Sequence, residues 1–435
     1  TNQSQRSGTS IPIISVINTT KPFSENPSPL HRTSPPPVEN STKTSNATIY
    51  HPPTKYIANL PANETSAKSS SHQLLLPIGD YQLVELQKDA SFWNAYNFFK
   101  GKDSLGSAGY QIYVDEHRSK ELGIAYTDES DSSVVIQSAY LPKKEKGDES
   151  TSRSAGRESI RLEGKKRYDY GLFIMDVEHM PFGCGVWPAF WLTDEANWPV
   201  HGEIDIVEGV NYQSVAKTAL HSTKGCNMYE VPDHVKTGTW DTAVGIPNKK
   251  TGIPDMTMRY AQDCFVYNPH QWLNQGCVAV DTEKGTLGAP LNKKGGGVYV
   301  LEWDPIFRHI RSWVFTPHTS VPENLRRTIQ TAWHEDPKQR VNPDPDEWPL
   351  PYGYFSIGEQ TNCPSSHFRN MRLVFNLAFC GSVAGNRFHL DCKRQAKVFD
   401  TCKEYVATDP KELKEAYWKV RGVYVYEREW ERAWL

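Results

Sequence analysis

Short runs rich in Val, Ile, Tyr, Phe and Trp follow one another through residues 78–430, and glycine and proline separate them. Some alternate apolar with polar positions and others are continuously apolar, as half-buried and fully buried strands require. The clearest runs are Gly171–Val177, Gly297–Trp303, His309–Phe315, Arg372–Phe379 and Gly422–Glu427. Many short strands within one long stretch predict an all-β sandwich or jelly roll.

Helical patterns are rare in the same region. One covers Pro410–Trp418, with Asp409 at the N-cap and Pro410 at the first helical position. A second covers Leu325–His334. Both are too short to change the prediction of an all-β domain.

Residues 1–77 have a different composition, and 40 of the first 72 residues are Ser, Thr, Pro or Asn. Such a segment cannot bury enough apolar surface to offset the entropy lost on ordering, so we predict a disordered tail before one domain over residues 78–435. Five Asn-x-Ser/Thr sequons indicate a glycosylated extracellular stalk, with chance occurrence as the alternative. They lie at Asn2, Asn18, Asn40, Asn46 and Asn63.

Composition and charge narrow the class of protein. The hydrophobic fraction of 38% is below a globular norm of roughly 45–50%, as expected when a tail dilutes a folded domain. The net charge of −3 argues against a nucleic-acid-binding protein, because no basic excess is available to neutralise phosphates. No run approaches the roughly 18 apolar residues of a membrane span. The chain starts at Thr1, so we expect that a leader or anchor was removed or omitted.

The eight cysteines contain no Cys-x-x-Cys pair, which argues against zinc-ribbon and thioredoxin sites. An even count in a chain with sequons predicts up to four disulfides and an extracellular or cell-surface location. Spacing does not give the connectivity, and several buried free thiols are the alternative.

The segment Gly202–Gly209 carries the candidate chemistry. On a strand, Glu203 and Asp205 share one face and Ile204 the other. Strict alternation turns Glu208 inward, where an unpaired carboxylate is costly. A β-bulge near Ile206–Val207 returns Glu208 to the acidic face, so three carboxylates line one side. A solvated acidic strand and a metal site are the alternatives.

Aromatic residues surround this acidic strand. Trp187, Trp191 and Trp198 precede it and His221 follows. Aromatic rings stack on the apolar faces of sugars, and paired carboxylates cleave glycosidic bonds, so the pattern favours a saccharide site. A hard-cation site needs more oxygen ligands and no aromatic wall.

This segment closely resembles glycoside hydrolase family 16, in its laminarinase-like branch of eukaryotic endo-1,3(4)-β-glucanases. The resemblance covers most of residues 90–427 and rests on ordered motifs. They are WPAFW (Trp187–Trp191), NWP (Asn197–Pro199), GEIDIVEGVN (Gly202–Asn211), LHSTKGC (Leu220–Cys226), SHFRNMRLVFNLAFCG (Ser366–Gly381), TCKEYVATDP (Thr401–Pro410) and AYWKVRGVYVY (Ala416–Tyr426). The bulged E-x-D-x-x-E is similar to the laminarinase form.

The resemblance implies a concanavalin-like jelly-roll sandwich with a concave substrate cleft, and retaining hydrolysis of internal β-1,3 or mixed β-1,3/1,4 glucan linkages. Glu203 is then the nucleophile and Glu208 the general acid/base, with Asp205 hydrogen-bonded to Glu203. Retention needs carboxyls about 5–5.5 Å apart. We expect a raised pKa for Glu208 and an ionised Glu203.

Several further residues match positions that line the family's cleft. Trp191 and Trp198 are expected to contact sugar, with core packing as the alternative, and Trp187 stands evenly between the two. His221 is either a site residue or a structural histidine. Asn211 and Glu359 are candidate hydrogen-bond partners of the substrate, against solvated loop positions. No cofactor is expected, and no motif supports the structural calcium found in parts of the family.

Three activities fit this fold: a glucanase, a glucan transglycosylase and a non-catalytic β-glucan-binding protein. Binding-only members typically lose the catalytic acids, whereas all three acids are present in this chain. We therefore predict a monomeric enzyme acting on β-glucan. The charged insertion around Lys143–Lys165 is expected to form a solvated loop. Val235–Leu291 and Arg326–Leu350 are longer than the family core. Long loops on this fold usually border the cleft, so they leave chain-length preference and linkage specificity open.

Overall fold

A computed structural model describes residues 73–434, except 78–79, 104–105, 141–155, 247, 249–250, 252, 254, 318–320, 409–410 and 429. All described residues belong to one of the chain's two units, Thr54–Leu435. The five sequons and most of the predicted tail lie outside the described residues. The last five tail residues, Gln73–Pro77, form strand β1, which pairs with β20 (Trp430–Trp434). The boundary predicted between residues 77 and 78 stays a prediction.

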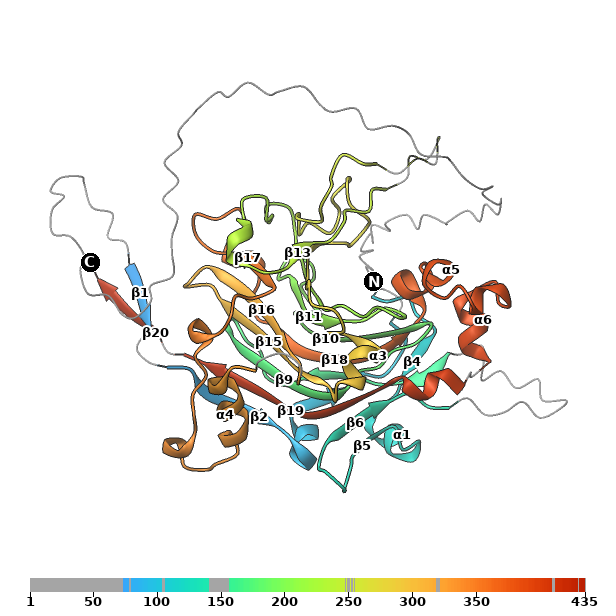
Figure 1. Cartoon of the computed structure of the whole chain (residues 1–435), viewed down its shortest axis with the longest axis horizontal. Coiled ribbons are helices and arrows are strands. Elements are labelled where there is room, and N and C mark those ends of the chain that lie inside the picture. Colours follow the sequence, from blue (N-terminus) through green and yellow to red (C-terminus); the bar gives the residue numbers. More distant parts are fainter. Residues whose placement is uncertain are drawn as a thin grey trace, which may run out of the picture. The chain divides into compact units, whose positions relative to one another are not determined.

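Two eight-stranded antiparallel sheets make up the domain, and Figure 1 shows them stacked and curved. The first, which we call the front sheet, contains the acidic strand near its centre. Its order is β13 (Thr239–Trp240), β14 (Cys277–Val280), β12 (Lys217–His221), β11 (Glu203–Glu208), β10 (Val186–Thr193), β18 (Arg372–Phe379), β8 (Arg161–Gly164) and β3 (Tyr96–Phe98).

The second sheet, the back sheet, lies below the front sheet in Figure 1. Its order is β17 (Gly353–Ser356), β16 (His309–Phe315), β15 (Gly297–Asp304), β9 (Gly171–His179), β19 (Tyr417–Glu427), β6 (Val134–Gln137) and β5 (Ala125–Thr127), with β2 (Gln82–Gln87) also paired to β19. A short parallel pair joins β4 (Gln111–Tyr113) to β7 (Arg157–Ser159).

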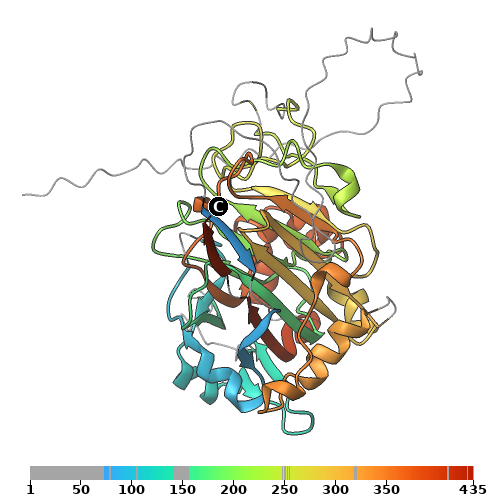
Figure 2. The same ribbon diagram turned by 90° about the vertical axis from the view of Figure 1, so that its left-hand side faces the viewer.

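The described helices are short and lie outside the two sheets. They are α1 (Glu116–Glu121), α3 (Gly288–Lys293), α4 (Glu323–Thr331), α5 (Phe388–Asp391) and α6 (Cys402–Ala407), with a π-helical turn at Gly381–Gly385 and 3₁₀ turns at Asp89–Ala95, Asp233–Val235, Pro337–Gln339, Pro345–Glu347, Ser365–His367, Gln395–Lys397 and Lys411–Glu415. Figure 2 shows α4 beside the sheets, and its Leu325 packs with Trp313 of β16 on the outer face of the back sheet. Among the described residues no helix is long and apolar enough to cross a membrane.

Alternation along the strands fills the space between the sheets. Phe190, Leu192 and Ile204 of the front sheet and Phe173 and Leu301 of the back sheet are all fully buried in one core. Each such side chain contributes about 1.5–3 kcal/mol by leaving water. In the front sheet, the residues that alternate with these core positions point to its outer face, which is concave in Figure 1.

All five strands predicted from the apolar runs are present. The helix predicted over Pro410–Trp418 is absent from the described residues 411–418, and its predicted start at Asp409 and Pro410 lies outside the described residues. Only Lys411–Glu415 forms a 3₁₀ turn, and β19 begins at Tyr417. Trp418 is fully buried with its ring 5.8 Å from Phe375, so core packing outweighs local helix propensity there. The helix predicted over Leu325–His334 corresponds to α4.

All eight cysteines are paired in four disulfides. This confirms the predicted maximum and supplies the connectivity. The pairs are Cys184–Cys392, Cys226–Cys363, Cys264–Cys277 and Cys380–Cys402. Cys226–Cys363 and Cys264–Cys277 cross-link the long segment that follows β12.

Candidate active site

The predicted bulge lies in β11 at Ile206. Asp205 pairs with Trp191 of β10 and Val207 with Phe190, so Ile206 has no opposite residue on that strand. Ile206 and Val207 are both buried in the core between the sheets. The extra residue therefore restores Glu208 to the same face as Asp205, as the sequence pattern required.

His221 joins the acidic strand from β12, where it lies opposite Glu203 in the register. Its Nε2 lies 3.0 Å from Asp205 Oδ2, and the side chain is only 6% exposed. Single ligand atoms of Glu203, Asp205 and His221 all lie within 4.8 Å of one another. The structure thus brings together three of the predicted site residues.

Trp187 completes the other end of the cluster. Its indole Nε1 donates a hydrogen bond of 2.6 Å to Glu208 Oε1. Trp187 and Trp191 lie two register positions either side of Ala189, which faces Glu208, so alternation places both indoles on the concave face. Trp187 is therefore a direct contact of a predicted catalytic group, and its own contact with sugar remains a prediction.

The other two tryptophans are partly exposed. Trp191 donates from Nε1 to Asn376 Oδ1 at 2.7 Å, and the Arg161 guanidinium lies 5.3 Å from its ring centroid. The buried Nε1 of Trp198 has no partner within hydrogen-bonding geometry among the described residues. This N–H nevertheless favours the charged form of Glu203 and lowers the pKa of that carboxyl.

Burial dominates the electrostatics of the three carboxyls. It raises the pKa of Glu203 to about 8, with a further rise from the Asp205 charge. Burial likewise raises the pKa of Asp205 to about 7 and the pKa of Glu208 to about 7. The raised pKa of Glu208 agrees with the prediction, but the expectation that Glu203 stays ionised in the free site is wrong. The three groups together hold protons at neutral pH.

Asn211 does not lie among these residues, and the structure contradicts its assignment to substrate. It is 2% exposed, with a positive φ of 55°. Its Oδ1 accepts from the Gly185 amide at 2.8 Å, and its Nδ2 donates to Ala384 O and Asp391 Oδ2 at 3.2 and 3.0 Å. The side-chain amide of Asn211 therefore bonds to groups inside the protein. Glu359 is exposed in a turn after β17, and its predicted contact with substrate stays untested.

Two polar residues near the site were missed from the sequence. Asn376 of β18 holds Trp191, and its signal was present as the one uncharged polar residue within the apolar run Leu373–Phe379. Asp194, directly after β10, anchors the loop that carries Trp198. A lone Asp after a strand gives no distinctive pattern.

The donor set formed by Glu203, Asp205 and His221 does not fit calcium. Calcium takes about six to eight oxygen ligands, whereas this set offers two carboxyls and an imidazole that is already hydrogen-bonded to Asp205. The arrangement fits proton transfer and nucleophilic attack within one small, largely buried cluster.

A family model described as an XgeA-like, catalytic GH16 domain matches residues 96–426. An endo-1,3(4)-β-glucanase of Arthroderma benhamiae is 33% identical over 354 residues, which cover 80% of this chain and 65% of that protein. A probable endo-1,3(4)-β-glucanase of Aspergillus fumigatus is 33% identical over 80% of this chain and 45% of its own length. The chain thus spans about half to two thirds of these relatives.

The similar solved structures belong to the same glycoside hydrolase family. Laminarinase 16A of Phanerochaete chrysosporium, solved with 6-O-glucosyl-laminaritriose in donor and acceptor sites, is 27% identical with a TM-score of 0.63. An elongating family 16 β-1,3-glucosyltransferase is 30% identical with a TM-score of 0.62. Each match covers 80% of this chain and 100% of the other.

Proposed function

Because this chain belongs to the XgeA-like group of glycoside hydrolase family 16, we propose that it is an endo-acting β-glucanase. It hydrolyses internal β-1,3 or mixed β-1,3/1,4 glucan linkages with retention of configuration. The observation that carries the proposal is the bulged strand β11, whose three carboxyls share the concave face with tryptophan side chains. The matched relatives named as endo-1,3(4)-β-glucanases support the same substrate class.

In the proposed first step, a carboxylate oxygen of Glu203 attacks the anomeric carbon. The bond to the leaving sugar breaks, and its oxygen takes the proton of Glu208. In the second step, Glu208 removes a proton from water, which attacks the same carbon and releases Glu203. The pKa of Glu208, raised to about 7 by burial, keeps this group protonated in weakly acidic solution before the first step and leaves about half of it protonated at pH 7.

Glu203 has to be ionised when it attacks. Burial and the neighbouring acids oppose that charge, while His221 and the Trp198 N–H favour it. The active form therefore carries protons on Asp205 and Glu208 and one negative charge on Glu203. A protonated Asp205 no longer carries the negative charge that raises the pKa of Glu203, so protonation of Asp205 favours the ionised nucleophile.

The aromatic side chains have a separate role. Trp191 and Trp198 are partly exposed beside the carboxyls, and their rings offer flat apolar surfaces to the faces of glucosyl units. Asn376 fixes the orientation of the Trp191 indole by accepting the hydrogen bond from its Nε1. The four disulfides are consistent with work in an oxidising, extracellular or cell-wall environment. A monomeric state remains a prediction.

A glucan transglycosylase is the second candidate, and one observation favours it. The elongating glucosyltransferase is 30% identical with a TM-score of 0.62, similar to the laminarinase match. Both activities share the glycosyl-enzyme on Glu203 and differ in whether water or a sugar hydroxyl attacks it.

The test is release of reducing sugar from laminarin, mixed-linkage glucan and cellulose by the wild-type chain and by Glu203→Gln. We expect activity on the first two substrates and its loss in the variant. Glu129→Gln, which alters an exposed carboxyl in the turn between β5 and β6 of the back sheet, controls for a change of charge. Activity retained by Glu203→Gln contradicts the assignment. A fluorescent laminari-oligosaccharide acceptor that grows longer instead of being cut identifies the transglycosylase.

A further inference from the structure

The loop Asp194–Gly202 joins β10 to β11, carries Trp198 and leads directly into Glu203. It is tightly folded: the Asn197 amide donates to Asp194 O at 3.1 Å, and the Gly202 amide donates to Pro199 O at 3.1 Å. The conformation of this loop therefore sets both the position of the Trp198 indole and the point at which β11 begins.

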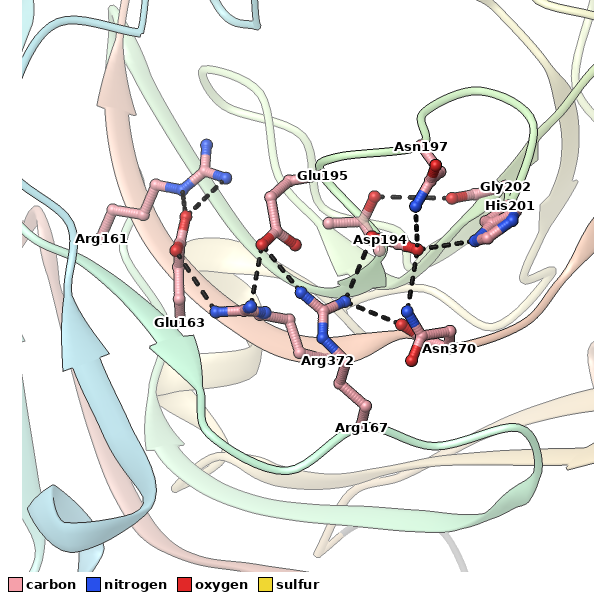
Figure 3. A network of polar contacts seen from close by, with 11 residues as sticks. Arg161, Glu163, Arg167, Asp194, Glu195, Asn197, His201, Gly202, Asn370 and Arg372 are labelled. Atoms are coloured by element: carbon pink, nitrogen blue, oxygen red, sulfur yellow. Dashed lines mark hydrogen bonds and ion pairs between the residues drawn. The ribbon is translucent and has the colours of Figure 1, made fainter.

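The Asp194 side chain accepts several of the hydrogen bonds that hold this loop. Asp194 is 1% exposed, and Figure 3 shows its carboxylate at the centre of a polar network. Oδ2 accepts from Asn197 Nδ2 at 2.8 Å and Asn370 Nδ2 at 3.0 Å, and lies 2.6 Å from His201 Nδ1. Oδ1 accepts from Arg167 Nη1 at 3.3 Å.

These donors come from three separate segments. Asn197 and His201 belong to the loop, Arg167 precedes β9, and Asn370 precedes β18. Arg167 also donates to Asn370 O at 2.8 Å. Burial alone raises the pKa of Asp194, but the hydrogen bonds from Asn197, Asn370 and His201 outweigh it and lower the pKa to about 2. The group thus stays ionised across ordinary pH and ties the loop to two neighbouring segments.

A row of ion pairs continues from the same arginine (Figure 3). Arg167 and Arg372 both lie 2.9 Å from Glu195, and Arg372 lies 3.6 Å from Glu163. Glu163 pairs at 3.0 Å with Arg161, whose guanidinium lies over Trp191. The network thereby connects the anchor of the Trp198 loop to the residue that packs on Trp191.

We propose that Asp194 is a positioning residue for the reaction, and that its carboxylate fixes the loop so that Trp198 lies beside Glu203. The inference rests on the proposed role of Glu203 as nucleophile. The far end of the loop has little freedom to compensate, because Gly202 has a φ of +72° and an added Cβ would lie 2.4 Å from His367 O. The carboxylate is needed because an amide nitrogen in place of Oδ2 would face the donors Asn197 and Asn370.

Asp194→Asn is the test because it keeps the size of the side chain. The matched control is Glu195→Gln, a neighbouring loop carboxyl that is 34% exposed and pairs with the same Arg167. Amide hydrogen exchange followed by mass spectrometry should show faster exchange in the peptide covering residues 195–202 for Asp194→Asn, with strand β19 unchanged. The control should exchange like the wild type. This readout needs no glucanase activity, so it separates a failure of the anchor from a failure of the proposed function.

A double-mutant cycle with Trp198→Phe tests the positioning role itself. We expect Asp194→Asn to lower kcat/KM on laminarin by about 10- to 100-fold in the wild-type chain, since small misplacements of catalytic groups have effects of this order. In the Trp198→Phe background the same change should cost less than about threefold, because both act through one loop. Unchanged exchange in residues 195–202, or equal losses of kcat/KM in both backgrounds, overturns the proposal.

Discussion

Replacing Glu203 by Gln should make the protein more stable at neutral pH while abolishing its activity. The pKa of Glu203 rises from 4.5 to about 8 on folding, chiefly through burial. A raised folded-state pKa means that stability is complete below the unfolded pKa and is lost as the pH rises through the folded one, since the unfolded chain releases the proton first. Glutamine carries no proton to lose and so avoids this cost.

The size of the effect follows from the same shift. Between pH 4.5 and pH 7 the unfolded carboxyl ionises while the folded one stays largely protonated, and each pKa unit is worth about 1.4 kcal/mol. The full interval corresponds to about 3 kcal/mol. Glu203 is partly exposed, and its neighbours titrate with it, so we expect about 2–3 kcal/mol at pH 7. For a domain of roughly 350 residues this raises Tm by about 3–4 °C.

The assay is calorimetric unfolding of wild type, Glu203→Gln and the exposed control Glu129→Gln at pH 4 and pH 7. Glu203→Gln should unfold at higher temperature than wild type at pH 7, and the difference should vanish at pH 4. The control should follow the wild type at both. A Glu203→Gln protein that is less stable than wild type by the same amount at both pH values would refute the reasoning, because the carboxyl would then carry no ionisation cost.

Three further outcomes follow from single contacts. Trp187→Phe removes the hydrogen bond that lowers the pKa of Glu208. The basic limb of the kcat–pH profile should therefore move to higher pH, and kcat should fall about tenfold or more. A basic limb at the wild-type pH contradicts this. Asn211→Ala should lower the free energy of unfolding by about 2–3 kcal/mol in urea titrations, because the Asn211 side chain bonds to core groups. KM for laminarin should stay unchanged. A raised KM would restore the assignment of Asn211 to substrate. Replacing Cys226 and Cys363 by Ser opens a loop spanning 137 residues and should lower the free energy of unfolding by about 2–5 kcal/mol in the same titrations. An unchanged free energy of unfolding contradicts this.

Much of the acidic strand was predictable from the sequence. Alternation assigned Ile204 to the core and Glu203 and Asp205 to the opposite face, and the cost of burying Glu208 required one extra residue. The structure has that residue at Ile206. The bulge was predictable because side chains alternate strictly along a strand and burying a charge is costly, so few backbone arrangements of this segment are stable.

Other features depend on contacts that no local pattern encodes. The spacing of Cys184 and Cys392, 208 residues apart, gives no sign that they meet. Asn211 is polar and follows the acidic strand, yet its backbone turn directs the amide into the core. Asp194 matters because Arg167 and Asn370 reach it from distant segments.

The ionisation state of Glu203 also could not be predicted from the sequence. A role as nucleophile predicts a charged group, whereas the pKa depends on how deeply the carboxyl is buried and how close Asp205 lies. These quantities are properties of the folded site. Burial raises the pKa of all three carboxyls, Glu203, Asp205 and Glu208. Their titrations are coupled, so the charge on Glu203 depends on its two neighbours.

Trapping the glycosyl-enzyme tests the central claim most directly. The wild-type chain would be incubated with a 2-deoxy-2-fluoro-β-laminaribiosyl fluoride, whose fluorine slows breakdown of the covalent intermediate, and then digested and analysed by mass spectrometry. The account predicts one added disaccharide unit, located on Glu203. An adduct on Glu208 would contradict the assignment of roles, and hydrolysis of laminarin with no adduct under any trapping condition would contradict the covalent, retaining mechanism.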